Sequence, residues 1–110
     1  MVNNKFKVAL SQALRLPTAE NKDVIVFELG SLTVEIYKPL EKDLQQPHTR
    51  DECYIVVSGT GTYSVDGEVM DFAPGDFLYA PAGVEHRFET FSEDFLTWVI
   101  FYGPEGGEPI

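Results

Sequence analysis

Apolar and polar positions alternate in short runs along most of the chain, and two kinds of periodicity divide it. Residues 5–15, KFKVALSQALR, place apolar side chains at the three- and four-residue spacing of a helix, which Pro17 would stop. From residue 24 onward the apolar runs are short, rich in β-branched and aromatic residues, and separated by turn residues. The pattern predicts one short amphipathic helix followed by roughly eight to ten strands.

The strand-like runs are VIVFEL, LTVEIY, CYIVVSG, DFLYA, HRFETF and DFLTWVIFY. The segment TYSVDGEVMDF is predicted to form a hairpin, because Asp66-Gly67 is a favoured pair for a type I′ turn. Turn signals at this spacing are typical of an all-β sandwich or barrel. We therefore predict a single domain over residues 1–110, with a β-barrel over 24–102 and a loose Gly- and Pro-rich tail over 103–110.

The overall charge restricts the partners of the chain. The formal net charge is −10 at pH 7 and the pI is near 4.4. Because nucleic acids and anionic membranes select basic surfaces, neither is expected as a partner. The one cysteine, Cys53, cannot form an internal disulfide, which favours a reducing compartment. The sequence shows neither a membrane-length apolar run nor a signal-peptide pattern, so a cytoplasmic location is expected.

The two histidines, His48 and His86, are the main candidates for chemistry. If the strand around CYIVVSG is regular and extends back to His48, then His48, Glu52 and Tyr54 share a face, because side chains of equal parity lie on the same side. The turn at PAGV reverses the chain, so that His86 can begin a strand beside the one that carries Glu52. A buried histidine and glutamate are costly unless paired or bound to an ion, and two imidazoles with one carboxylate suit first-row metals.

A longer spacing pattern surrounds His86. The run GDFLYAPAGVEH has Gly75, five residues, Pro81, one residue, Gly83, two residues and His86. It matches the second of the two motifs by which the cupin superfamily is recognised, and Thr90 replaces the Asn that often follows. This motif is moderately specific by itself.

The first cupin motif, a Gly, His-x-His, Glu and a later Gly, is matched in part by QPHTRDECYIVVSG. Glu52 and Gly59 have the spacing of its last two members, and His48 takes the place of the second histidine, whereas Gln46 stands at the first. With both motifs, the chain resembles a small single-domain cupin over about residues 46–90. The resemblance implies an all-β, cupin-type double-stranded β-helix, or jelly-roll barrel, with a short N-terminal helix.

The resemblance also implies a site for a divalent metal ion (Fe, Mn, Zn or Ni), whose identity the sequence leaves open. Cupins commonly use three histidines and one glutamate. Here the ligands would be His48, Glu52 and His86, with Gln46 as a possible weak and neutral fourth ligand. Gln46 could equally act as a hydrogen-bond donor in the pocket. Fewer protein ligands would leave the ion more open to substrate or water.

Other interpretations of the same residues stay open. The two histidines could form a hydrogen-bonded pair without a metal, and Glu52 could form a salt bridge to Arg50 or Arg87. Arg50 could hold a substrate carboxylate or turn outward to solvent. Cys53 is expected to be a small buried hydrophobic residue. The candidate substrate contacts are Tyr54, Phe88, Arg50 and Tyr79. Five acidic residues are expected to form solvated surface: Glu41, Asp43, Asp51, Glu93 and Asp94.

Two functions from different classes follow from this sequence. The first is a metal-dependent enzyme, of the dioxygenase or Lewis-acid type, that acts on a small organic acid or carbonyl compound. The second is a non-catalytic cupin module that binds a small ligand. The sequence leaves open which of them applies. The run FLTWVIFY is apolar on both faces of a strand, as if both faces were buried, and therefore predicts a homodimer. The N-terminal helix could also pack on this region.

Overall fold

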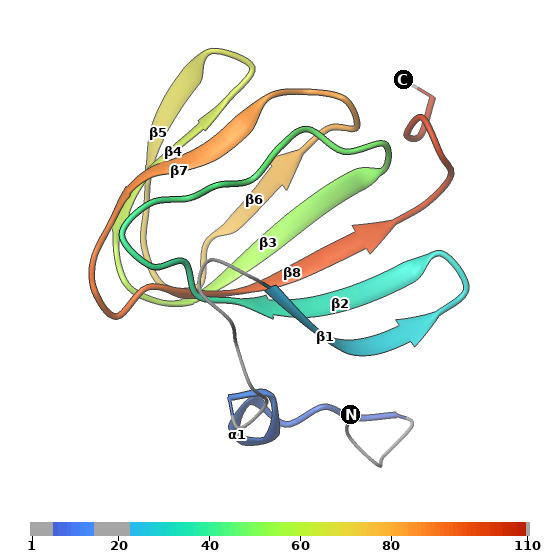
Figure 1. Cartoon of the computed structure of the whole chain (residues 1–110), viewed down its shortest axis with the longest axis horizontal. Coiled ribbons are helices and arrows are strands. Elements are labelled where there is room, and N and C mark those ends of the chain that lie inside the picture. Colours follow the sequence, from blue (N-terminus) through green and yellow to red (C-terminus); the bar gives the residue numbers. More distant parts are fainter. Residues whose placement is uncertain (1–5, 15–22, 110) are drawn as a thin grey trace.

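The computed structural model describes residues 6–14 and 23–109, which contain one short helix and eight strands (Figure 1). The helix is α1 (Leu10–Ala13). The strands are β1 (Asp23–Leu29), β2 (Leu32–Tyr37), β3 (Asp51–Ser58), β4 (Gly61–Val65), β5 (Glu68–Phe72), β6 (Phe77–Ala80), β7 (His86–Phe91) and β8 (Leu96–Tyr102). The predicted all-β class is confirmed, and each strand-like run of the sequence overlaps one of these strands.

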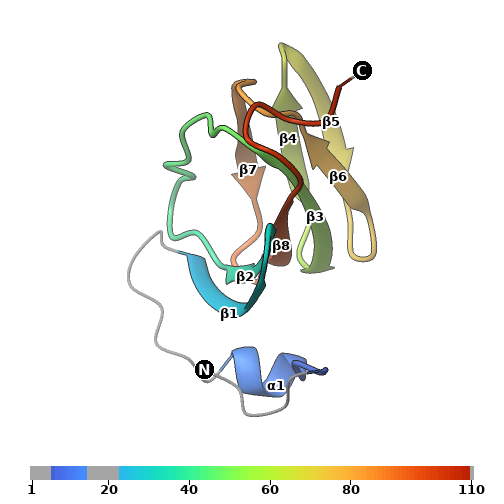
Figure 2. The ribbon, with the colours of Figure 1, turned by 90° about the vertical axis from the view of Figure 1, so that its right-hand side faces the viewer.

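Two antiparallel sheets enclose a common interior. The larger sheet has the strand order β1-β2-β8-β3-β6, and the smaller has the order β5-β4-β7. The last strand, β8, lies between β2 and β3, so the larger sheet joins strands that are distant in sequence. Figures 1 and 2 show the sheets facing each other across the interior, and side chains from both meet in one buried cluster. This arrangement is the jelly-roll barrel.

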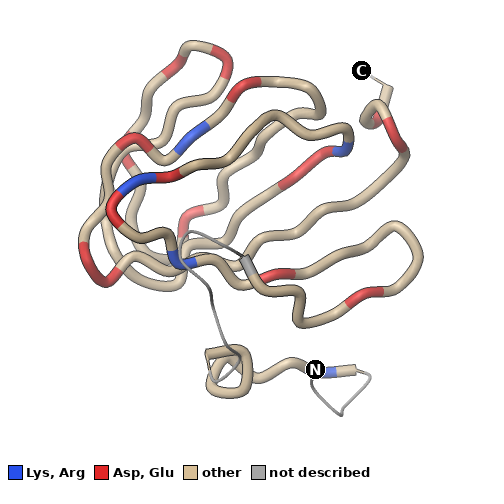
Figure 3. Tube along the Cα trace, viewed as in Figure 1, with Lys and Arg blue, Asp and Glu red and all other residues tan. Residues whose placement is uncertain are grey.

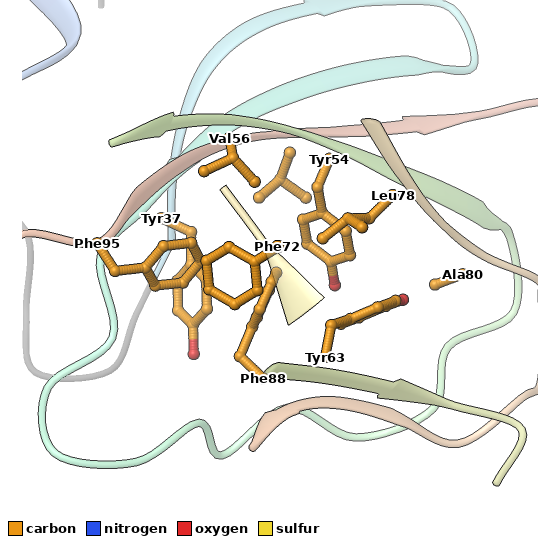
Figure 4. Close-up of a cluster of buried hydrophobic side chains, with 10 residues drawn as sticks. Tyr37, Tyr54, Val56, Tyr63, Phe72, Leu78, Ala80, Phe88 and Phe95 are labelled. Carbon is orange, nitrogen blue, oxygen red and sulfur yellow. The ribbon is translucent and has the colours of Figure 1, made fainter. Parts of the chain in front are cut away.

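The alternation of side chains along β3 decides what faces this interior. Glu52 and Tyr54 are both 0% exposed, whereas Ile55 on the other face is 39% exposed. Below them, aromatic rings from both sheets fill the centre of the barrel (Figure 4). The ring of Phe88 lies 4.9 Å from that of Tyr54 and 5.1 Å from that of Tyr63, measured between centroids. Because these rings fill the centre, an open site has room only toward one end of the barrel.

The hairpin between β4 and β5 has the predicted turn. Asp66 and Gly67 have φ values of 51° and 81°, and a type I′ turn requires a positive φ at both central residues. Glycine adopts this conformation without a Cβ penalty, and Asp is among the few other residues that tolerate it. The local sequence alone is sufficient to specify this turn.

The N-terminal helix is shorter than the predicted span of 5–15. It covers Leu10–Ala13, residues 6–9 lie outside it, and residues 5, 15 and 17 lie outside the described residues. So short a helix has little stability of its own, and its apolar side chains instead pack on the outer face of the larger sheet. Within the described ranges, the structure has no helix with the length and apolar character needed to span a membrane.

The outer face of β8 is therefore partly covered from within the chain. Val8, Leu10 and Ala13 belong to a cluster with Trp98 of β8 and Val34 of β2. The interior face of β8 contributes Val99, which is 1% exposed, to the barrel core. These contacts account for the two-sided apolar character of FLTWVIFY without a second copy of the chain. The homodimer remains a prediction.

The C-terminal segment does not hang free of the barrel. Residues 103–109 fold back to its end, where the Gly106 amide donates to the Thr49 carbonyl at 2.7 Å. The Glu108 amide donates to Asp51 Oδ2 at 2.8 Å. The Gly and Pro content suggested a loose tail, but these bonds to residues far away in sequence hold it in place.

Candidate metal centre

Three segments bring the sequence-predicted ligands together at one end of the barrel. Glu52 is the second residue of β3, and His86 is the first residue of β7 in the opposite sheet. His48 lies in the loop that precedes β3. Glu52 and His86 are 0% and 2% exposed, whereas His48 is partly exposed. The three side chains form a His–Glu–His group whose ligand atoms could hold a metal ion.

The three ligand atoms form a compact triangle. His48 Nε2 lies 2.5 Å from Glu52 Oε1, His86 Nε2 lies 3.0 Å from the same oxygen, and the two Nε2 atoms are 3.3 Å apart. The circle through these atoms has a radius of about 1.7 Å, which is shorter than the bonds of about 2.0–2.2 Å that Zn²⁺ makes to nitrogen and oxygen ligands. One ion can therefore reach all three atoms at normal bond lengths.

The hydrogen bonds of the imidazoles decide which nitrogen faces the cluster. His48 Nδ1 lies 2.7 Å from the Arg50 carbonyl oxygen, and His86 Nδ1 lies 3.0 Å from the Val84 carbonyl oxygen. A carbonyl oxygen only accepts, so each Nδ1 carries the proton and donates it. In the neutral rings, the lone pair of Nε2 then points at Glu52. Such backbone carbonyls commonly fix the tautomer of metal-binding histidines.

The cluster consequently brings three acceptors together and needs a cation. Two Nε2 lone pairs and an ionised carboxylate repel one another unless a proton or a metal ion lies between them. The second carboxylate oxygen, Glu52 Oε2, is buried without a hydrogen-bond partner. A buried anionic oxygen of this kind is costly unless something positive satisfies it. The donor set and the orphaned oxygen both fit a divalent ion.

A proton on one imidazole can also offset the repulsion between the three acceptor atoms. The pKa values of Glu52 and His86 are shifted in the directions that favour such a proton. Burial would raise the pKa of the Glu52 carboxyl, but the hydrogen bonds and charge interactions with His48 and His86 together outweigh burial and lower it. Burial would lower the pKa of His86, but its bonds to Glu52 and to the Val84 carbonyl, together with the nearby carboxylate charges, outweigh burial and raise it. Protons and a metal ion therefore compete for the same atoms, as they do at most protein metal sites.

Three further hydrogen bonds hold the segments that carry these ligands. The Gly83 amide donates to the His48 carbonyl at 2.7 Å, which joins the turn before β7 to the loop before β3. Asp51, beside Glu52, accepts from the Ala82 amide and the Tyr79 hydroxyl, both at 3.0 Å. Asp51 was expected on solvated surface, and this expectation is wrong, because its side chain caps backbone donors and is 3% exposed.

The stability supplied by Asp51 should depend on pH. Backbone hydrogen bonds from Glu108 and Ala82 lower its pKa below the usual 3.8, despite burial. A lowered pKa adds stability above the pKa of the unfolded chain, and this stability is lost as pH falls through the folded-state value. We expect Asp51→Asn to lower the free energy of unfolding by about 1–3 kcal/mol at pH 7 and by less at pH 3, where part of this stability is already lost. Urea unfolding of both proteins at the two pH values measures the difference, and an equal loss at both would contradict the prediction.

A second buried acid supports the loop between β2 and β3, residues 38–50. Asp43 is 3% exposed, so its predicted place on solvated surface is also wrong. Its Oδ1 accepts from the Tyr37 hydroxyl at 2.7 Å, and its Oδ2 accepts from the Phe88 amide of β7 at 2.9 Å. Gln45 completes the network, because its side-chain amide donates to Asp43 while its Oε1 accepts from the Tyr54 hydroxyl at 3.0 Å. Sequence reasoning missed Asp43 and Gln45, since both lie in an irregular loop without periodicity.

The remaining sequence-predicted residues lie in different surroundings. Gln46, the possible fourth ligand, is exposed, and its neighbour Gln45 points inward instead. Residues 46–50 precede β3 rather than belong to it, so the parity of a strand does not extend to them. The guanidinium of Arg50 donates to the Ser31 carbonyl, which commits it to the turn between β1 and β2. Glu52 pairs with histidines and not with an arginine.

The three aromatic residues predicted to contact substrate lie in different parts of the barrel. Tyr54 is fully buried beneath the cluster, with its ring centroid 6.3 Å from that of His86. Phe88 belongs to the aromatic core below Tyr54 and is 1% exposed, so other rings rather than solvent surround it. Tyr79 pairs with Cys53 on the outer face of the sheet, because its neighbours Leu78 and Ala80 face the interior. Only Tyr54 among them lies next to the ligand atoms.

A pocket of about 610 Å³ opens beside His48. Its walls come from the loop before β3 (residues 47–49), the turn before β7 (Ala82 and Gly83) and the C-terminal segment (Glu105 and Gly106). Because the aromatic core fills the barrel below the cluster, this pocket is an entrance and not a deep cavity. It has space for a small molecule to approach His48.

Two curated proteins are similar in sequence to part of this chain. A curated protein of Streptomyces coelicolor, described as uncharacterized, is 46% identical over 57% of this chain and 60% of its own length. A 5-nitrosalicylic acid 1,2-dioxygenase of Bradyrhizobium sp. is 33% identical over 60% of this chain, and the match spans only 32% of that enzyme. The chain therefore covers less than two thirds of either relative.

A solved structure shows the same fold along most of the chain. The cupin-2 domain containing protein of Shewanella frigidimarina has a TM-score of 0.69 and 17% identity, and the match covers 87% of this chain and 94% of that protein. The family model Cupin_2, described as a cupin domain, matches residues 33–102. This match runs from β2 to the end of β8 and includes all three ligand residues. The chain therefore belongs to the Cupin_2 family of cupin domains.

Proposed function

We propose that this cupin binds one divalent first-row metal ion through His48 Nε2, the Glu52 carboxylate and His86 Nε2. The observation that supports this most directly is the convergence of three acceptor atoms within 3.3 Å of one another. Two histidines and one carboxylate on one face of an ion leave its other positions open to small molecules, as in non-heme iron oxygenases. The proposed role is a metal-dependent enzyme of the dioxygenase or Lewis-acid type that acts on a small organic acid or carbonyl compound.

The metal would polarise a substrate oxygen and, if it is iron, would also allow chemistry with dioxygen. The chain's own residues supply the rest of the site. Burial holds the pKa of the Tyr54 phenol well above its usual value, so Tyr54 stays a neutral hydrogen-bond donor. The aromatic rings below it exclude water from the interior side. Substrate would enter through the pocket beside His48.

The dioxygenase form of the proposal draws on one relative. The 33% identical Bradyrhizobium protein carries the name of a dioxygenase that acts on 5-nitrosalicylic acid, and the match spans 32% of it. With Fe²⁺ bound, we therefore expect oxygen consumption on addition of a small aromatic hydroxy acid or its carbonyl analogues. An oxygen electrode measures it, with the metal-free protein as the blank. Substrate turnover without oxygen uptake would favour the Lewis-acid form.

Metal analysis tests the proposal itself. Untagged protein is incubated anaerobically with equal amounts of Fe²⁺, Mn²⁺, Ni²⁺ and Zn²⁺, separated from free ions, and analysed by mass spectrometry of the elements. We expect about one ion per chain in the wild type and less than about 0.2 in His48→Ala and in His86→Ala. Glu68→Gln, which alters an exposed carboxylate of β5, is the matched control and should keep its ion. Wild-type protein without stoichiometric metal would contradict the proposal and favour a non-catalytic ligand-binding module.

A further inference from the structure

The entrance to the candidate site has a wall that neither cupin motif supplies. Glu105 and Gly106, from the segment after β8, line the pocket beside His48. The other lining residues come from the two loops that position His48 and His86. Figure 1 shows this segment returning over the end of the barrel from the tip of β8. A molecule that approaches His48 therefore passes the C-terminal segment.

This wall is held closely against the rest of the entrance. The Gly106 amide donates to the Thr49 carbonyl at 2.7 Å, and the Glu108 amide donates to Asp51 Oδ2 at 2.8 Å. At Gly107, where φ is +89°, an added Cβ would lie 2.9 Å from the Ala82 Cβ and 3.2 Å from Asp51 Oδ1. The two bonds, at Gly106 and Glu108 just after Glu105, and this close approach hold the backbone next to Glu105 against the entrance.

The described residues that line the entrance carry negative charge and no positive charge from Lys or Arg. Of the residues that line the pocket, Glu105 is the one with a formal charge at neutral pH, and no Lys or Arg of the described residues lines it. Arg50, which follows the lining residue Thr49, donates to the Ser31 carbonyl. Figure 3 shows acidic positions in the C-terminal segment, and the chain as a whole carries a net charge of −10. A carboxylate that enters the pocket therefore meets the like charge of Glu105, and no guanidinium or ammonium group among the described lining residues offsets it.

We propose that Glu105 is a specificity-determining residue, which favours uncharged carbonyl or hydroxyl compounds over carboxylate anions at the entrance. The inference rests on the proposed metal site and narrows its substrate class to the carbonyl compounds. Glu105 acts on the approach and binding of the ligand and has no part in holding the ion. Repulsion between charges in a partly solvated pocket weakens with added salt. The effect of Glu105 on ligand binding should therefore depend on salt concentration, unlike an effect of shape.

The test compares two ligands of equal size that differ in charge. Glycolate and its uncharged amide, glycolamide, both present a hydroxyl and a carbonyl-type oxygen to a metal ion. Their dissociation constants are measured on the Co²⁺-loaded protein by the change in its visible absorption, at low salt and in 0.5 M NaCl (roughly a 4 Å Debye length). The variants are Glu105→Gln, Glu105→Lys and the control Glu108→Gln, which changes an exposed acid of the same segment that does not line the pocket.

At low salt, we expect Glu105→Gln to tighten glycolate binding about threefold and Glu105→Lys about tenfold, with glycolamide unchanged within about 1.5-fold. Glu108→Gln should leave the dissociation constants of both ligands unchanged. The tighter binding of glycolate by the Glu105 variants should become smaller in 0.5 M NaCl, because salt screens the repulsion. Unchanged glycolate binding in both Glu105 variants, or equal changes for both ligands, would overturn the inference. If the protein still bound Co²⁺, the proposed function would stand. Absence of Co²⁺ bands in the wild type would instead remove the proposed function, and this inference with it.

Discussion

Glu52→Gln is expected to weaken binding of a divalent ion by about 100-fold or more. Glu52 is the one anionic donor of the three, and its Oε1 lies within 3.0 Å of both Nε2 atoms. A glutamine keeps the size of the side chain but offers a neutral oxygen, and its amide hydrogens would point at acceptor lone pairs. Competition with a chromophoric chelator measures the affinity of both proteins for Zn²⁺.

Two controls keep this result interpretable. Glu68→Gln makes the same chemical change on an exposed part of β5 and should leave affinity unchanged. Because Glu52 also pairs with both histidines when no metal is bound, circular dichroism should first confirm that Glu52→Gln is folded at the temperature of the affinity measurement. Affinity within about threefold of the wild type would show that Glu52 is not a ligand.

The largest effect on stability is expected from Asp43→Ala, at about 3–5 kcal/mol in the free energy of unfolding. The Asp43 carboxylate accepts from the Tyr37 hydroxyl, the Phe88 amide and both the backbone and side-chain amides of Gln45. Truncation would remove this shared acceptor from the buried Tyr37 hydroxyl and Phe88 amide and from the partly buried amides of Gln45. Urea unfolding monitored by circular dichroism measures the loss.

The control for Asp43→Ala lies in the same loop. Lys42 is exposed, so Lys42→Ala should change the free energy of unfolding by less than about 0.5 kcal/mol. Since Asp43 ties the loop that carries His48 to β7, the loss in Asp43→Ala should be accompanied by weaker metal binding. A loss below about 1 kcal/mol would mean that solvent readily replaces Asp43 as the acceptor.

Much of the candidate site could be predicted from sequence, for reasons that are local. His86 follows a Pro-x-Gly turn, and a turn of this kind specifies where the next strand begins. Glu52 and Tyr54 lie two residues apart inside a regular strand, so the pleat alone places both on one face. His48 lies outside that strand, and it joins Glu52 and His86 through the loop geometry and the bond from Gly83 to its carbonyl.

The wrong predictions share a physical cause. The parity of the strand was extended back to His48, but β3 begins only at Asp51, and an irregular loop has no fixed parity. Asp43 and Asp51 were placed on the surface because acids seldom become fully buried. Their burial depends on amides that lie far away along the chain, in Phe88 for Asp43 and in Glu108 for Asp51. No local pattern records such partners.

By itself, the sequence determined the strands, the hairpin turn at Asp66-Gly67, the inward face of β3 and the identity of the three proposed ligands. These features depend on neighbours a few residues apart, through the pleat, the favoured turn conformations and the spacing of the motifs. Only the tertiary structure decided that the C-terminal segment forms a wall of the entrance, that Gln45 rather than Gln46 turns inward, and that Asp43 and Asp51 are buried. Each of these depends on hydrogen bonds between residues that the fold brings together and whose separation in sequence gives no signal.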